Sequence, residues 1–374
     1  MRLLLLTSIL LLSLSDIAQK SYLFVGTYTE KNDSKGIYVY QFDNASGDAR
    51  PVSTVFTDNP SYLAIAQEGN FVYAVNETHG AKPGGVSAFS FDSKTGQLKF
   101  IDKQESGGDD PCYVSVDSHH KWLMVANYSG GSLSALPIQS DGSLLARTQT
   151  IRHTGAGPNK QRQEKAHVHS VTFSPDEKYL LAADLGMDEL SVYRFDAIAT
   201  SEPLKASRDS IVRVQPGSGP RHISFYPGRP YVYLLNELGG AVDAYRYSDG
   251  RLTPFQHISS HPEGYTGEIG SADIHITPNG KFLYASNRGD ANSIAIYSID
   301  AATGRLQIKG FQSTRGKTPR NFMIDPTGRW LLVANQNSGN IFIFRINKET
   351  GLLEDTGKSI NIPSPVCLKM MAAE

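Results

Sequence analysis

The apolar positions of the chain fall into short segments, most of them about six residues long, with polar turns rich in Gly, Pro, Asp and Asn between them. Beyond residue 18, no stretch of useful length places apolar residues three and four apart, as an amphipathic helix requires. The many Tyr, Gly and Pro residues agree with strands joined by turns. The pattern therefore predicts a protein built from β-strands.

One unit of this pattern recurs along the chain: a short strand, a turn containing Pro, Asp or Gly, and an apolar strand that usually ends in Asn. A third strand follows each apolar strand, and a fourth often begins at a Gly-x-Leu turn. The apolar strands end 48 to 57 residues apart. Four strands at this period are typical of a β-propeller blade. The apolar strands are expected at 22–27, 71–76, 122–127, 179–184, 231–236, 282–287 and 330–335, and the third strands at 36–42, 85–91, 131–138, 189–195, 240–247, 293–299 and 339–346.

Seven such units fill residues 19–374, which predicts one all-β domain: a seven-bladed β-propeller with four antiparallel strands per blade. The first unit lacks an inner strand at its N-terminal side. The segment 364–371 resembles the missing strand, because Pro365 opens it as Pro111 opens the inner strand of a later unit. We therefore expect the C-terminal strand to complete the first blade and to pair two otherwise open edges.

Residues 1–18 have the features of a secretory signal peptide: Arg2, an apolar run from Leu3 to Leu14, and small residues up to Ala18. Cleavage after Ser15 is an alternative to cleavage after Ala18, and an uncleaved N-terminal anchor is another. In each case the body of the protein faces an extracytoplasmic space, so we expect a periplasmic or secreted protein. No later run is long and apolar enough to span a membrane.

The composition excludes several classes of function. The chain has 36 Lys and Arg against 37 Asp and Glu, and lacks the excess positive charge of a nucleic-acid-binding protein. Its two cysteines, Cys112 and Cys367, fall on inner strands two blades apart and are expected to be buried rather than bonded to each other. No Gly-x-Ser-x-Gly motif is present, so a serine nucleophile is not predicted.

Aligning the units on the ends of the apolar strands places charged residues at two repeated positions. The first position lies fifteen residues before each strand end, at the start of the inner strand, and the second lies one residue after the strand end. Because these two strands are antiparallel neighbours, both positions must emerge on one face of the disc near its axis. The residues expected to converge there are His169, Arg221, Glu237, Arg288 and Arg320.

Convergent charges at the mouth of a central channel predict a binding site. Three arginines with a glutamate suit an anionic or oxygen-rich small molecule, because a guanidinium can hold a carboxylate or phosphate with two hydrogen bonds. The alternative is that these charges only pair with each other across neighbouring blades. Further candidate substrate-binding residues near the same rim are His222, His275, His167, Asn127 and Gln336.

The largest spacing between units contains an insertion at about 152–166, which is polar and Gly-rich. A loop of this length in a compact fold is typical of a lid or binding loop, and Arg162 is its candidate substrate-binding residue; a solvated excursion is the alternative. His167 and His169 share one strand face, but no third residue at metal-site spacing accompanies them. We therefore expect neither a metal nor another cofactor.

Several short motifs resemble the lactonase family of seven-bladed β-propellers, which includes 6-phosphogluconolactonases and the fungal carboxymuconate lactonizing enzymes. They span residues 24–336 of the chain, and together they are specific although each alone is weak. The motifs are FVGTYT at 24–29, VANYSGG at 125–131, HVH at 167–169, GPRH at 219–222, LNE at 235–237, IHITP at 274–278, PRNF at 319–322 and VANQ at 333–336.

The resemblance implies hydrolysis of a sugar lactone to its aldonic acid, with His169, Arg221 and Glu237 as the proposed active-site residues. In such a reaction Glu237 or His169 takes a proton from water, and Arg221, aided by Arg288 or Arg320, stabilises the oxyanion. The resemblance leaves open whether the lactone is phosphorylated. Two other functions remain open: lactonization of a muconate-type dicarboxylate, and a non-catalytic propeller that binds a glycan or a protein.

Overall fold

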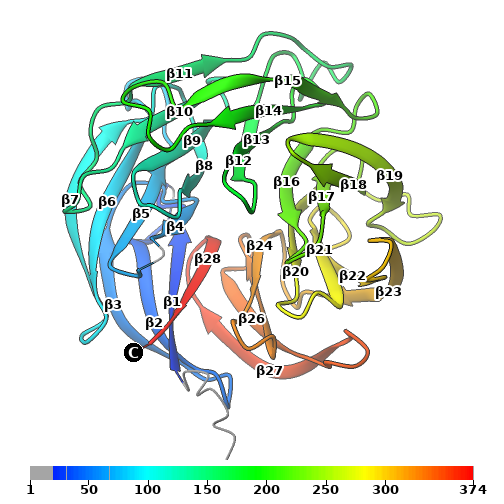
Figure 1. Ribbon diagram of the computed structural model, residues 1–374. Helices are drawn as coiled ribbons and strands as arrows, with labels where there is room; N and C mark the ends of the chain where they lie inside the picture. Colours follow the sequence, from blue (N-terminus) through cyan, green and yellow to red (C-terminus); the bar gives the residue numbers. More distant parts are fainter. Residues whose placement is uncertain (1–19, 31, 67, 374) are drawn as a thin grey trace, which may run out of the picture.

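The computed structural model describes residues 20–30, 32–66 and 68–373, and the expected signal peptide at 1–18 lies outside them. In these residues, 28 strands form seven four-stranded antiparallel sheets arranged in a ring around a central axis (Figure 1). The prediction of a seven-bladed propeller is confirmed. The same residues contain no helix long and apolar enough to cross a membrane.

Each blade begins with an inner strand at the axis and ends with an outer strand at the rim of the disc. From the axis outwards, blade one contains β28 (Pro365–Ala372), β1 (Lys20–Thr27), β2 (Gly36–Asp43) and β3 (Ala49–Phe56). Blade two contains β4 (Leu63–Ile65), β5 (Phe71–Asn76), β6 (Gly85–Asp92) and β7 (Gln97–Glu105). Blade three contains β8 (Pro111–Val116), β9 (Trp122–Asn127), β10 (Ser132–Pro137) and β11 (Gln149–Arg152). Blade four contains β12 (Val168–Phe173), β13 (Tyr179–Asp184), β14 (Glu189–Phe195) and β15 (Leu204–Arg213).

The remaining three blades complete the ring. Blade five contains β16 (Pro220–Phe225), β17 (Tyr231–Asn236), β18 (Ala241–Ser248) and β19 (Arg251–Ser259). Blade six contains β20 (Ser271–Ile276), β21 (Phe282–Asn287), β22 (Ser293–Ile299) and β23 (Leu306–Ser313). Blade seven contains β24 (Pro319–Ile324), β25 (Trp330–Asn335), β26 (Asn340–Ile346) and β27 (Leu353–Asn361).

The C-terminal strand closes the ring as predicted. β28 pairs with β1 in antiparallel register, with Leu368 opposite Val25, so the last strand of the chain becomes the inner strand of the first blade. The two ends of the described chain therefore hold each other in one sheet, and β28 covers the edge that β1 would otherwise expose.

The apolar strands are the second strands of the blades, and their core positions explain their composition. β9, β13, β17, β21 and β25 are buried along their whole length, because neighbouring blades cover both faces of each sheet. Because both faces are buried, apolar residues follow one another along these strands and do not alternate with polar residues as in a half-exposed strand.

The fourth strand of blade three does not begin at its Gly-x-Leu turn, which is Gly142-Ser143-Leu144, although a fourth strand was expected to begin there. Leu144 forms only an isolated bridge with Ile138, and β11 begins at Gln149.

The Asn residues that end the second strands tie down the loops that enter the inner strands. The amide of Asn76 donates to the Asp58 carbonyl over 2.7 Å, and that of Asn287 donates to the Ser260 carbonyl over 2.6 Å. Asn335 makes the corresponding bond to Thr314. Because each of these carbonyls lies in the segment just before an inner strand, the repeated Asn fixes where the strands that surround the axis begin.

Candidate active site

A cavity of about 650 Å³ opens at one end of the central axis, where the two repeated positions meet. Half of its Asp, Glu, Lys and Arg lining residues come from these positions, which the antiparallel pairing of inner and second strands brings together. The lining residues are Glu77, Cys112, Tyr128, Arg162, His169, Glu237, Glu268, Ile269, Gly270, Arg288, Gly289, Asp290, Asn292, Lys317, Thr318, Arg320 and Asn337.

Local irregularities in the inner strands direct several of these side chains. In four blades the pairing between the inner and second strand shifts by one residue, and the extra residue is Cys112, His169, Arg221 or Arg320. A β-bulge leaves its extra residue outside the ladder and changes the direction of its side chain. The bulge therefore belongs to the repeat itself and places one residue of each of these blades at the same end of the axis.

Glu237 is the most heavily paired side chain of the cavity. Its Oε2 lies 2.9 Å from Nε of Arg221 and 2.9 Å from Nη2 of Arg288, while its Oε1 lies 2.6 Å from Nη2 of Arg162. The Nε2 atom of His169 is 3.9 Å from Oε2 of Glu237. Three guanidinium groups and one imidazole thus surround a single buried carboxylate.

These neighbours determine the protonation states of the pair. Burial by itself raises the pKa of Glu237, but the charges of Arg288 and Arg221 outweigh burial and hold the pKa well below its ordinary value. Burial lowers the pKa of His169 far below 6.5, and Arg221 adds to this effect. At neutral pH the site therefore holds an ionised Glu237 beside a neutral His169.

Arg221 lies beneath the cavity rather than in its wall. Its side chain is 2 % exposed, and it bonds to Glu237 and to the carbonyl of Ala272. Burial and the charges of Arg288 and Arg320 lower the pKa of Arg221 to about 10, so it stays protonated at neutral pH. Arg221 supports Glu237 from below and does not reach the cavity.

Arg320 differs from the other three arginines, because no carboxylate lies within 4 Å of its guanidinium and it makes no hydrogen bond among the described residues. Its guanidinium carbon lies 5.4 Å from the centre of the Tyr28 ring, a cation–π contact. It lines the cavity beside Glu77. An unpaired cation in a cavity wall is suited to an anion or to developing negative charge on a ligand.

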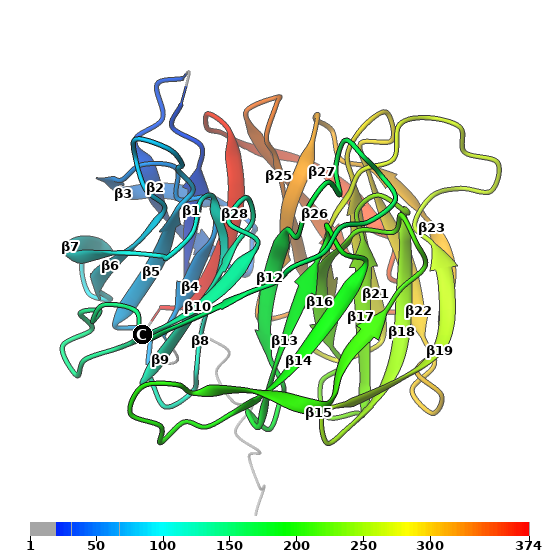
Figure 2. The ribbon, with the colours of Figure 1, turned by 90° about the horizontal axis from the view of Figure 1, so that it is seen from above.

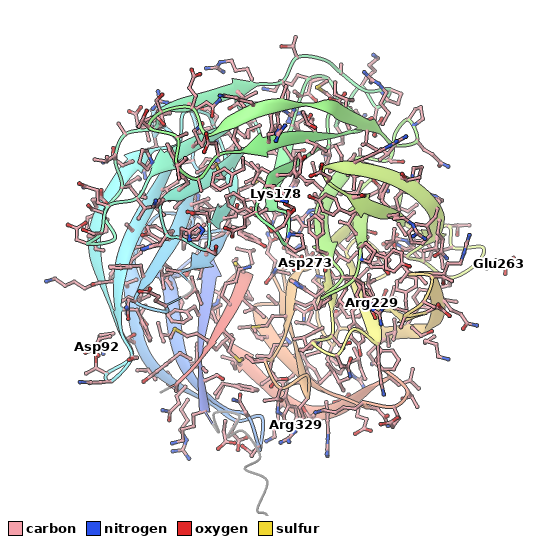
Figure 3. All side chains as sticks on the ribbon, viewed as in Figure 1. Asp92, Lys178, Arg229, Glu263, Asp273 and Arg329 are labelled. Carbon is pink, nitrogen blue, oxygen red and sulfur yellow. The ribbon has the colours of Figure 1, made fainter. Side chains whose placement is uncertain are left out.

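His222 and His275 lie on the inner strands but do not line the cavity. Nδ1 of His222 is 2.7 Å from Oδ1 of Asp273, and Nε2 of His275 is 2.9 Å from Oδ2 of the same carboxylate. Asp273 lies close to the centre of the ring (Figure 3). The two imidazoles thus satisfy a buried carboxylate near the axis.

Three other predicted binding residues are also not among those that line the cavity. His167 is buried, stacks on Tyr128 with ring centres 4.4 Å apart, and lies 3.1 Å from Oε1 of Glu164. Asn127 is fully buried and its amide donates to the Ser106 carbonyl, as the repeated Asn does in other blades. Gln336 donates its backbone N–H to Thr318.

The inserted loop at 152–166 joins β11 to β12 and is anchored at several points. Gln163 is fully buried and donates to Asp188 over 2.7 Å, and Lys165 donates to the Ser129 carbonyl over 2.8 Å. Arg162 extends from this anchored loop to Glu237 and also donates to the Tyr128 hydroxyl. Arg162, the predicted substrate-binding residue of this loop, therefore lines the cavity, and its role in substrate binding stays a prediction.

Several cavity residues were not among those predicted. Glu77, Cys112 and Tyr128 occupy the same repeated positions as the predicted residues. Treating the residue at these positions in every blade as a candidate would have found them. Glu268, Asp290, Asn292, Lys317 and Asn337 lie on loops and turns of blades five to seven, where the repeat gives no signal.

Comparison with known proteins places the chain in one family. Residues 22–370 match the family model described as lactonase, 7-bladed beta-propeller. The chain is 39 % identical over 353 residues to a 6-phosphogluconolactonase of Formosa agariphila, covering 93 % of this chain and 99 % of the relative. It is 36 % identical over 352 residues to the 6-phosphogluconolactonase of Bacillus subtilis, covering 93 % and 97 %.

A solved structure resembles the whole propeller. The periplasmic gluconolactonase of Pseudomonas aeruginosa superimposes with a TM-score of 0.91 at 38 % identity, over 95 % of this chain and 100 % of that protein. The family resemblance noted from the motifs is thereby confirmed over nearly the whole described chain. The protein therefore belongs to the lactonase family of seven-bladed β-propellers.

Proposed function

We propose that this protein hydrolyses a sugar lactone to its aldonic acid in the periplasm or outside the cell. Membership of the lactonase family and the two 6-phosphogluconolactonase relatives support lactone hydrolysis. The signal-like segment at 1–18 and the similarity to a periplasmic gluconolactonase support the location. The observation that carries the proposal is that Arg320, which has no ion pair within 4 Å, lines the same cavity as the His169–Glu237 pair.

Arg320 is the group proposed to stabilise the transition state. When water attacks the lactone carbonyl, negative charge develops on the carbonyl oxygen. A cation that is already in place and makes no direct ion pair can accept this charge without first giving up a partner. The other three arginines each hold Glu237, so Arg320 is the cavity arginine most available to the substrate.

His169 is the proposed general base. Its neutral imidazole can take the proton of the attacking water, and the Glu237 carboxylate 3.9 Å away then stabilises the imidazolium that forms. The same proton passes to the ring oxygen as the bond between carbonyl carbon and ring oxygen breaks, which yields the open aldonic acid. Glu237 is a less suitable base, because three guanidinium groups already engage its two oxygens.

The direct test is the hydrolysis of glucono-1,5-lactone by the purified protein at constant pH, corrected for the spontaneous reaction. We expect Arg320→Ala to lower kcat/KM by about 10²–10³, the usual cost of losing one oxyanion donor. Arg345→Ala, which removes an exposed arginine outside the cavity, serves as the matched control. An unchanged rate in Arg320→Ala would refute the assignment, and saturable binding without turnover by the native protein would favour the non-catalytic alternative.

The pH profile tests the base separately. Because the pKa of His169 is far below 6.5, kcat/KM should stay level from pH 8 down past pH 6.5 and fall only in more acidic solution. His169→Gln should lower kcat by about 10² or more while changing KM little. An acid limb centred near pH 6.5, or normal kcat in His169→Gln, would exclude His169 as the base.

A further inference from the structure

The cavity is larger than a monosaccharide lactone requires. A hexonolactone has about a dozen non-hydrogen atoms and fills about 200 Å³ at the packing density of a protein interior. The cavity holds about 650 Å³, and His169, Glu237 and Arg320 lie in only one part of it. The remaining volume of the cavity is large enough for a second chemical group of the substrate.

The unused part of the cavity lies over blades five to seven, and we call it the outer subsite. It is lined by Glu268 and Ile269 at the inner end of the β19–β20 loop, by Asp290, by Lys317 and by Asn337. This loop projects from the disc in Figure 2, and Glu263 marks its outer part in Figure 3. The outer subsite therefore lies at the end of this projecting loop that leads into β20.

The side chains of the outer subsite have free polar groups of both kinds. The Lys317 ammonium, the Asn337 amide and the Glu268 carboxylate have no side-chain partner among the described residues, and Asp290 uses only Oδ2, which accepts the backbone N–H of Glu268 over 2.8 Å. Ile269 is 42 % exposed and offers an apolar surface. Donors, acceptors and an apolar face together match the hydroxyl groups and the C–H face of a neutral sugar ring.

The charge balance of the outer subsite disfavours a phosphate. Two carboxylates, Glu268 and Asp290, face one ammonium, Lys317. Phosphate sites in proteins gather several Arg or Lys side chains or backbone N–H groups, and carboxylates close by repel the dianion. The cavity arginines do not supply this charge, because Arg162 and Arg288 hold Glu237 and Arg320 faces the reacting carbonyl in the proposed mechanism.

From this geometry we infer that the preferred substrate is a glycosylated sugar lactone, whose lactone ring lies at His169 and Arg320 and whose second, neutral sugar unit fills the outer subsite. This inference rests on the proposed lactonase function and adds the substrate class. Such lactones form when the reducing end of a disaccharide is oxidised, so an oxidation of that class must supply the substrate.

The test compares three probes with the purified protein: glucono-1,5-lactone, its 4-O-glucosyl derivative cellobiono-1,5-lactone, and 6-phosphoglucono-1,5-lactone. We expect kcat/KM for the glycosylated lactone to exceed that for glucono-1,5-lactone by about tenfold or more, mainly through a lower KM. The double variant Lys317→Ala/Asn337→Ala should bring this ratio close to one. Lys121→Ala, an exposed lysine outside the cavity, should leave the ratio of the native protein unchanged.

The outcomes separate the inference from the proposed function. Equal kcat/KM for the glycosylated and simple lactones, or a ratio that the double variant does not change, would overturn the outer subsite. If the protein prefers the phosphorylated lactone and Lys317→Ala removes this preference, the outer subsite binds a phosphate and not a second sugar, and the inference is wrong. If none of the three lactones is hydrolysed, the proposed lactonase function itself fails.

Discussion

Glu77 and Glu237 occupy the same position in their repeats, one residue after the second strands of blades two and five, and both line the cavity. Their surroundings differ completely. Glu237 is held by three guanidinium groups, whereas Glu77 accepts hydrogen bonds from the hydroxyls of Tyr28, over 2.8 Å, and Ser61. The repeat thus determines where a carboxylate emerges, and its neighbours determine its chemistry.

The neighbours of the two carboxylates come from the same two repeated positions of the fold, but from different sides. Arg221 and Ser61 both precede the second strand of the same blade by the same spacing, whereas Arg288 follows the second strand of the next blade and Tyr28 follows that of the preceding blade. Guanidinium groups therefore surround Glu237, while hydroxyl groups bond to Glu77. Local side-chain identity gives two carboxylates at the same repeated position different surroundings.

The largest expected difference between the two carboxylates is in stability. Glu237→Gln leaves the buried Arg221 without its carboxylate and should lower the free energy of unfolding by about 3 kcal/mol. Glu77→Gln keeps a hydrogen-bonding oxygen for Tyr28 and should cost about 1 kcal/mol. Urea unfolding of both variants measures the difference, and equal losses would show that the ion cluster has no special role.

Acid solution should lower the stability of the native protein more than that of Glu237→Gln. Because the pKa of Glu237 is lower in the folded protein than the ordinary value of about 4.3, its stabilising effect is complete above that value and is lost as the pH falls below it. Between pH 5 and pH 3, the native protein should lose about 1.5 kcal/mol more than Glu237→Gln. Unfolding curves at both pH values give this number, and parallel losses in the two proteins would contradict the depressed pKa.

Removing the most exposed member of the cluster should have the smallest effect. The side chain of Arg162 is 44 % exposed, so solvent weakens its ion pair with Glu237, and Arg162→Ala should cost less than about 1 kcal/mol of stability. Because Arg162 is part of the cavity wall, its removal should still raise KM for the lactone about fivefold. Lys160→Ala on the same loop is the matched control. If Arg162→Ala lowers the free energy of unfolding as much as Glu237→Gln does, the exposed Arg162–Glu237 ion pair contributes most of the stability of the cluster.

The sequence by itself determined the number of blades, nearly all the second strands and the closure by the C-terminal segment. These features depend on local patterns: apolar runs of about six residues, turns at Gly and Pro, and a repeat of about 50 residues. The same alignment also predicted that His169, Glu237, Arg288 and Arg320 would share one end of the axis, because antiparallel pairing alone puts both repeated positions on one face.

Only the tertiary structure decided which charges pair. It placed Arg221 beneath the cavity and left Arg320 without an ion pair within 4 Å. It also paired His222 and His275 with Asp273 and extended the cavity over the loops of blades five to seven. The reason is that these contacts join residues far apart in the chain and depend on bulges and loop paths, which apolar periodicity does not encode. A repeat predicts where side chains emerge, while distances of a few ångströms between blades decide what they contact.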